Sequence, residues 1–152
     1  MSDHTIRGSI VGLNLSNSLE SLTAIYLSTI QALAFSTKHI LEKMNEKGYQ
    51  IKNIFITGGL AKNEIYIEQV SSICQVNVIV PKEKDAVLLG CAILASSSFR
   101  SVSIFDEMQK MSQIGKIVSP STLPSIVDFF HKKYKVFLEM YEDQKKYKQM
   151  MN

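Results

Sequence analysis

The chain has 152 residues, which is enough for one ordinary domain with its own hydrophobic core. Apolar residues make up 45% of the sequence and charged residues 20%, a composition that excludes a disordered chain. The net charge of +3 is small and spread along the sequence, which argues against a nucleic-acid-binding protein.

Several features of the sequence predict a cytoplasmic location. The chain opens with the polar stretch Met1-Ser-Asp-His-Thr, and no apolar h-region of a signal peptide follows it. The most apolar segment, Leu22 to Phe35, is too short and too rich in polar residues to span a bilayer. Cys74 and Cys91 lie in apolar surroundings without C-x-x-C spacing, so we expect buried free thiols in a reducing compartment. Neither a membrane nor a nucleic acid is an expected partner.

The first third of the chain predicts an irregular segment and then a long helix. Residues 1–16 are expected to be extended or irregular, because glycines interrupt any helical pattern there. Asn17 stands three residues before Glu20, as in a capping box, and is expected to begin the helix. The helix is apolar nearly all round, so we expect it to be buried on several sides. Gly48 is a suitable residue to end it.

The middle of the chain predicts a strand–helix–strand unit. Ile51 to Thr57 is apolar without strict alternation, which indicates a strand covered on both faces. A helix is expected from about Asn63 to Cys74, and a second short strand from Val76 to Val80. A connection of this length implies that the two strands are parallel and joined by a right-handed crossover.

The next helix, predicted for Ala86 to Ala95, contains two small residues, Gly90 and Ala92. They either allow another helix to pack closely or leave room for a ligand or a neighbouring loop. Packing is the favoured interpretation, because a glycine inside a helix lowers stability and usually has a steric reason. Asp85 is expected to cap this helix at its start, and the three serines 96–98 to end it.

The last part of the chain predicts three further elements. These are a short helix from about Ser103 to Met111, a strand-like stretch at Lys116 to Val118, and a helix that starts near Pro124. Aromatic and apolar residues recur along the last helix at steps of three and four and form one stripe: Val127, Phe130, Tyr134, Phe137 and Tyr141. Its many lysines indicate either a solvated face or a helix that docks on a partner.

The best candidate for a functional site is the turn at Gly58 and Gly59, which follows the first strand and precedes Asn63. Glycine lets a ligand approach the main chain, and the following helix start offers unpaired N–H groups and a partial positive charge. The spacing matches neither a Walker loop nor a Rossmann fingerprint. Local chemistry leaves two alternatives equally open: a nucleotide site, or an ordinary turn that Asn63 caps.

The sequence offers no catalytic residue and no metal site. His4, His39 and His131 are scattered, and none of them has a Cys, Asp or Glu at metal-ligand spacing. Asp85 is the only carboxylate between two apolar elements, and the role of a cap is favoured over that of a catalytic base.

Four segments in order resemble the C-terminal domain of the FGGY carbohydrate kinases. The family's lead-in to a long helix is matched by Arg7-Gly8-x-x-x-Gly12-Leu13. The long helix itself is matched by Leu22 to Lys38. Residues 56–63 match the G-G-x-x-x-N adenosine segment, and residues 80–92 match the V-x-x-P-x-x-x-E-x-x-x-x-G-A-A run. Residues 111–120 and the tyrosine-rich last helix most resemble the animal members of the D-ribulokinase type.

The resemblance implies an α/β fold: part of an actin-like, ribonuclease-H-like ATPase domain, helix-rich, with a short parallel β-α-β unit. Residues 1–120 would form the incomplete C-terminal kinase domain, and residues 121–152 an amphipathic helix packed on it. ATP or ADP would be the cofactor. Its binding residues, carried over from the family's motifs and the turn around them, are Gly58, Gly59, Leu60, Lys62, Asn63 and Gly90.

The sequence also departs from the family. Gln31-Ala32 stands where many members have Glu-Gly, Asp85 where many have Glu, and Cys91 where alanine is common. The D-x-G-T and G-T-S phosphate loops are absent, and the catalytic aspartate belongs to the N-terminal domain. We therefore expect the chain to be the adenosine-binding end of a pentulose kinase whose sugar is D-ribulose. Mg²⁺ would be held mainly by the missing part, and the chain would be inactive alone.

Two further interpretations remain open. The chain could be a non-catalytic module that binds nucleotide or docks on a kinase. It could also fail to fold stably alone. Without the absent strands, the sheet edge and the sheet face that these strands would cover are exposed.

Overall fold

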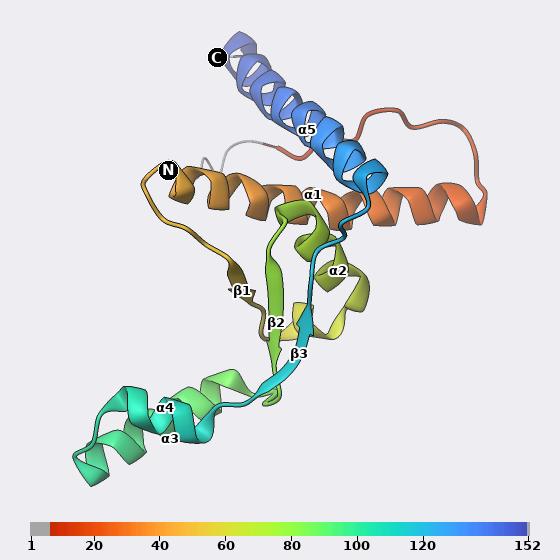
Figure 1. The fold of residues 1–152 in the computed structure, drawn as a ribbon. Helices are drawn as coiled ribbons and strands as arrows, with labels where there is room; N and C mark the ends of the chain where they lie inside the picture. The colour runs from red at the N-terminus through yellow and green to blue at the C-terminus, as the bar shows by residue number, and fades with distance from the viewer. Residues whose placement is uncertain (1–6, 152) are drawn as a thin grey trace.

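A computed structural model describes residues 7–151 of the chain (Figure 1). His4 and the polar opening residues 1–6 lie outside this range. The elements follow the expected order, and their bounds are α1 Leu19–Asn45, β1 Asn53–Phe55, the 3-10 turn η1 Gly59–Lys62, α2 Glu64–Cys74, β2 Asn77–Pro81, α3 Ala86–Arg100, α4 Ile104–Met111, β3 Ile114–Val118 and α5 Pro124–Met151.

The three strands form one mixed sheet in the order β1-β2-β3. β1 and β2 are parallel, with Ile54 opposite Val78, and α2 connects them. This arrangement confirms the predicted β-α-β unit. β3 pairs antiparallel with the other side of β2, with Ile117 opposite Ile79, so β1 and β3 are the edge strands (Figure 1).

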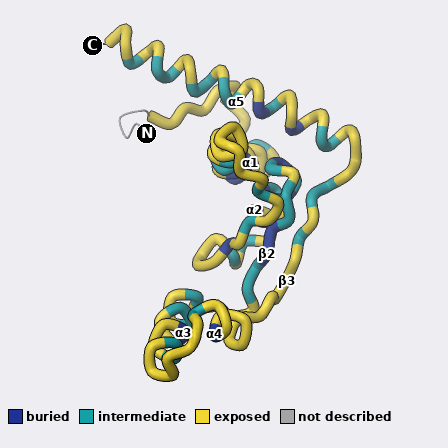
Figure 2. Tube along the Cα trace, turned by 60° about the vertical axis from the view of Figure 1, so that its left-hand side comes forward, coloured by how far each residue is buried: buried dark blue, intermediate teal, exposed yellow. Residues whose placement is uncertain are grey.

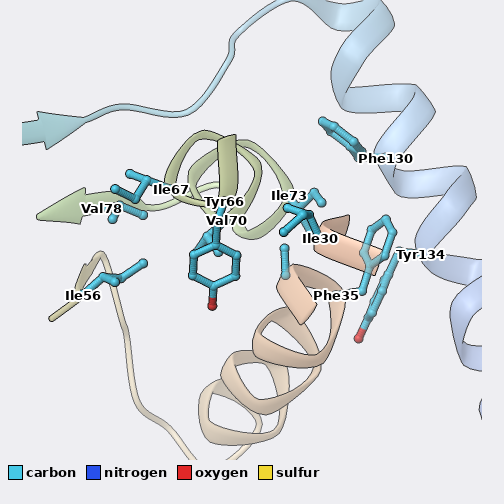
Figure 3. Packing of buried hydrophobic residues seen from close by; sticks show 11 residues of the cluster. Ile30, Phe35, Ile56, Tyr66, Ile67, Val70, Ile73, Val78, Phe130 and Tyr134 are labelled. Carbon is cyan, nitrogen blue, oxygen red and sulfur yellow. The ribbon is translucent and has the colours of Figure 1, made fainter. Parts of the chain in front are cut away.

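The hydrophobic core lies where α1, α2 and α5 meet, and it continues onto β2 (Figure 3). Phe35 of α1 is its aromatic centre, stacked on Tyr134 at 5.8 Å and edge-on to Phe130 at 6.4 Å between ring centroids. Val70 and Val78 are fully buried on the α2 and β2 side. The stripe predicted along the last helix is therefore the face of α5 that packs on α1.

Polar side chains fasten α5 to α1 around this core. The hydroxyl of Tyr134 donates to Glu42 Oε2 at 2.6 Å. Lys133 Nζ donates to Gln31 Oε1 at 2.6 Å, and Gln31 Nε2 donates to Gln69 Oε1 at 2.9 Å. Gln31, one of the departures from the kinase pattern, is thus a buried link between α1, α2 and α5.

Two expectations for the first helix and strand are wrong. α1 begins one residue later than expected, because Ser18 Oγ, not the side chain of Asn17, accepts the hydrogen bond of the Ser21 N–H at 3.2 Å. The expected burial is also absent. α1 was expected to be buried on several sides, but Leu22 is 62% exposed, and β1 was expected to be covered on both faces, but Phe55 is 64% exposed. The reason is that α1 packs mainly on α2, with further contacts to α5, so its remaining faces are open to solvent.

The α3–α4 hairpin stands at the far end of the sheet from α1 and α5, and most of it is exposed (Figures 1 and 2). α3 does not end at the three serines, as expected, but continues to Arg100. Ser96 Oγ donates to Glu107 Oε2 of α4 at 2.6 Å, and Ser97 Oγ to the Val102 carbonyl at 2.7 Å, so these hydroxyls bind the hairpin together instead of ending the helix.

The cysteines differ in their surroundings. Cys74 is partly buried, and burial raises its pKa to about 12, whereas Cys91 on α3 is exposed, contrary to expectation. In the described range α3 packs mainly on α4, and this packing leaves Cys91 exposed. No helix of residues 7–151 has the length and apolar character needed to cross a membrane.

Candidate functional site

The glycine turn begins where β1 leaves the sheet. The N–H of Ile56 still donates to the carbonyl of Ile79 at 3.0 Å, and the chain then turns at Gly58. Gly58 has φ 77° and ψ −154°, a backbone conformation that glycine adopts readily and that side chains with a Cβ avoid. η1 follows at once, and the N–H of Ala61 donates to the Gly58 carbonyl at 3.2 Å. Glycine is therefore required at position 58 by the backbone itself.

Gly59 has no such requirement. Its φ lies outside the left-handed region, and a Cβ built there would meet no atom of the described residues within 4 Å. The residue is exposed on the outside of the turn. Space is thus open above its Cα, as close approach of a ligand to the main chain requires.

Asn63 caps α2. Its Oδ1 accepts the hydrogen bond of the Tyr66 N–H at 3.1 Å, which confirms the capping interpretation of this residue. Its Nδ2 donates to the hydroxyl of Tyr26 on α1 at 3.1 Å. The turn is therefore held from two sides, by the helix that follows it and by α1.

Leu60 and Lys62 complete the turn. Leu60 is half-exposed and offers an apolar surface, and the side chain of Lys62 is exposed to solvent. The turn thus combines open main chain, an apolar side chain and a cation next to the N-terminus of α2, where the helix dipole favours negative charge.

Gly90 lies apart from this turn, on α3. A Cβ added there would meet no atom of residues 7–151 within 4 Å, and Ala92 is exposed. The packing interpretation favoured for these two small residues is therefore wrong within the described chain, because no helix lies against this face. The structure brings five of the six expected site residues together in the turn from Gly58 to Asn63, and it leaves Gly90 apart from them on α3.

A shallow pocket of about 280 Å³ opens at the start of α3. Glu83, Asp85, Leu88, Leu89 and Ala92 line it. Asp85 occupies the N-cap position of α3, but its carboxylate accepts no capping hydrogen bond from the described residues, so the expected capping role is not realised. Its own N–H is taken by Glu83 Oε1 at 3.3 Å.

A larger groove of about 1280 Å³ lies between residues 7–14, α1 and α5. Sequence reasoning missed it, although a signal for it exists. Ser21, Ala24, Ser28 and Ala32 recur at steps of three and four along α1, and all four line the groove. Small side chains on one helix face leave room for a neighbour, and here that room forms the floor of the groove.

Glu107 is a buried carboxylate, with 2% of its side chain exposed, but its partners are structural. The Ser96 hydroxyl and the Lys110 ammonium group hold its pKa below the usual value, with Lys110 Nζ at 3.2 Å. The arrangement joins α3 to α4 and offers no free base. In the described range, no three His, Cys, Asp or Glu side chains gather as metal ligands would.

Comparison with known proteins relates the chain to a family. A model of the C-terminal domain of the FGGY family of carbohydrate kinases matches residues 1–99. An "FGGY carbohydrate kinase domain-containing protein" of Danio rerio is 41% identical over 146 residues, which are 95% of this chain and 26% of the relative. A D-ribulokinase of Saccharomyces cerevisiae is 29% identical over 99 residues, 64% of this chain and 14% of the relative.

Solved structures show the same fold. A xylulose kinase from Rhodospirillum rubrum superposes with a TM-score of 0.75 at 18% identity, over 95% of this chain and 29% of that one. The likeness gives the fold class, the actin-like ATPase fold of these kinases, in agreement with the expectation from the sequence motifs. The chain spans about a quarter of the length of the animal relatives that it matches over nearly all of its own length.

Proposed function

Because the chain belongs to the FGGY family of carbohydrate kinases, we propose that it forms the adenosine-binding part of an ATP-dependent sugar kinase. The observation that carries the proposal is the turn from Gly58 to Asn63. It joins a parallel strand to a helix N-terminus, and its main chain is open above Gly59. A flat, apolar ring with an anionic tail suits such a place.

Each residue of the turn has a role in this proposal. Gly58 provides the backbone conformation, and Gly59 provides the surface on which the nucleoside lies. Leu60 contacts the apolar part of the nucleoside, and Lys62 attracts the phosphates. Asn63 lies at the edge of the base. Gly90, on the open face of α3, leaves space for the other side of the nucleotide once the domain is complete.

We propose a pentulose, D-ribulose, as the phosphate acceptor. The support is the similarity to the D-ribulokinase of Saccharomyces cerevisiae. The sugar itself would be held outside this chain, on the remainder of a kinase.

Phosphoryl transfer needs a carboxylate that accepts the proton of the sugar hydroxyl, and groups that hold the phosphates in line. The 152 residues contain neither a D-x-G-T nor a G-T-S phosphate loop. No metal-ligand cluster forms among residues 7–151, so Mg²⁺ would reach this part of the kinase on the phosphates of ATP. We therefore infer that the chain binds nucleotide and does not transfer phosphate by itself.

The remaining organisation follows from the same proposal. Residues 121–152 would belong to the same domain as residues 1–120, since Phe130 and Tyr134 of α5 lie in the common core. The free thiols of Cys74 and Cys91 suit a reducing compartment such as the cytoplasm.

The proposal is tested by titrating the chain with ADP and by a coupled kinase assay with ATP and D-ribulose. Saturable binding without turnover is the expected result. Turnover of D-ribulose by the purified chain would contradict the proposed inactivity, and absence of binding by the folded chain would contradict the adenosine role.

A second candidate is a non-catalytic docking module. The observation in its favour is the exposed apolar surface of the α3–α4 hairpin, where Val87 is 80% and Phe99 91% exposed. Such a surface marks an interaction site in a soluble protein. Co-elution with a full-length FGGY kinase in size-exclusion chromatography, together with no response to ADP, would favour docking over nucleotide binding.

A further inference from the structure

The glycine turn is joined to α1 by one side-chain hydrogen bond, between Asn63 Nδ2 and the hydroxyl oxygen of Tyr26, 3.1 Å apart. We propose that Tyr26 is a further ligand-binding residue of this turn, whose hydroxyl donates its proton to an acceptor atom of the bound nucleoside. The inference rests on the proposed function and adds to it a residue 37 positions away in the sequence.

The direction of the hydrogen bonds follows from the chemistry of the groups. The backbone N–H of Tyr66 can only donate, so the atom of the Asn63 carboxamide that faces it at 3.1 Å is the oxygen. The atom that faces Tyr26 is then the amide nitrogen, which also can only donate. The Tyr26 oxygen is therefore the acceptor in this pair, and its own proton is not used in it.

Two donors remain next to each other as a result. Tyr26 keeps its O–H, and Asn63 keeps the second hydrogen of its amide nitrogen. No acceptor for either is present among the hydrogen bonds of the described residues. Tyr26 is 49% exposed, so its hydroxyl can be reached from the solvent side.

Another tyrosine shows the contrasting case. The hydroxyl of Tyr134 is buried, donates its proton to Glu42 at 2.6 Å, and has its pKa raised, with burial as the largest cause. Its proton is committed to the α1–α5 contact. Tyr26 differs because its partner is an obligate donor, which leaves the proton available to a ligand.

The donor pair fits a ligand atom that accepts hydrogen bonds. A nucleoside offers two such atoms that can be removed one at a time, N7 of the purine and the 2′-hydroxyl oxygen of the ribose. Both share the chemistry of a neutral acceptor, and ligands that lack one or the other distinguish them.

The test compares the 152-residue chain with Tyr26→Phe and with Tyr49→Phe, a control at another exposed tyrosine. Binding of ADP, 7-deaza-ADP and 2′-deoxy-ADP is measured by calorimetry, and unfolding by circular dichroism. We expect Tyr26→Phe to weaken ADP binding about three- to tenfold, as for one neutral hydrogen bond, and Tyr49→Phe to bind like wild type. Both variants should unfold within about 2 °C of wild type.

The analogues identify the acceptor. The analogue that lacks it should bind wild type and Tyr26→Phe with the same affinity, while the other analogue keeps the difference. Equal ADP affinity of wild type and Tyr26→Phe would overturn the inference and leave the adenosine role intact. No ADP binding by the folded wild-type chain would instead overturn the proposed function, and the inference with it.

Discussion

Substitution of Gly59 by alanine tests why the turn has glycine at this position. It distinguishes a requirement for ligand binding from a requirement of the backbone conformation. Gly59 has no left-handed φ, and a Cβ there meets no atom of the described residues within 4 Å. Gly59→Ala should therefore leave the free energy of unfolding unchanged or raise it by about 0.4–1 kcal/mol, because alanine reduces the freedom of the unfolded chain. The same Cβ would project into the space that the nucleoside is proposed to occupy, so ADP binding should weaken at least about tenfold, or about 1.4 kcal/mol.

Gly58→Ala and Gly48→Ala are the matched controls. Both glycines have positive φ, 77° and 93°, and open surroundings, so alanine at either position should lower the free energy of unfolding by about 1–3 kcal/mol through backbone strain. Gly48 lies between α1 and β1, outside the turn, and its variant should keep the ADP affinity of wild type.

The assays are urea unfolding followed by circular dichroism and titration with ADP by calorimetry. Gly59→Ala should retain stability and lose binding, whereas Gly48→Ala should lose stability and retain binding. The reasoning would be refuted if Gly59→Ala bound ADP as wild type does, or if the loss of binding followed the loss of stability across the three variants.

Four further substitutions test the fold. Phe35→Ala removes the aromatic centre of the core and should lower the free energy of unfolding in urea titrations by about 3–5 kcal/mol. Its control is Phe99→Ala, at a residue 91% exposed, which should change the free energy of unfolding by less than about 0.5 kcal/mol. Gly115→Ala places a Cβ 2.9 Å from the backbone of Lys82, so β2 and β3 must separate, and urea unfolding should show a loss of about 1–3 kcal/mol. The pKa of Glu107 is lowered in the folded state, mainly by the Ser96 hydroxyl. The ionised carboxylate therefore stabilises the fold above its usual pKa of 4.5, and this stabilisation is lost as the pH falls through the lowered pKa of the folded state. Thermal unfolding of wild type from pH 7 to pH 3 should show that loss, and Glu107→Gln should lack this component.

Local patterns were sufficient to predict the elements whose residues interact with near neighbours in sequence. The β-α-β unit, the start of α5 at Pro124 and the cap at Asn63 all follow from periodicity and from hydrogen bonds that span three residues. The apolar stripe of α5 predicted its buried face because the period of the pattern is the period of the helix.

Burial was predicted less well, because it depends on neighbours that a helix pattern does not reveal. Leu22 and Phe55 are apolar, as buried residues usually are, yet both are exposed in the described part of the chain. In the proposal that the chain is part of a larger kinase, the remainder covers these faces and the free edge of β1. The prediction that serines 96–98 end a helix was wrong for a related reason. The Ser96 hydroxyl donates a hydrogen bond to Glu107, which lies on the next helix.

The candidate site was predicted in part. The turn from Gly58 to Asn63 was found from its glycines and motif order, and its residues do lie together. Tyr26 was not found, because nothing in the local sequence connects a residue inside α1 with an asparagine 37 positions later. The assignment of all six residues to a nucleotide remains a prediction.

Titration of the folded 152-residue chain with ADP is the most direct test of the adenosine role. A cooperative thermal melt first establishes that the protein is folded. The predicted result is saturable heat with a dissociation constant on the order of millimolar or lower, and binding at least about tenfold weaker in Gly59→Ala. No heat up to several times that concentration, from a chain that melts cooperatively, would contradict it.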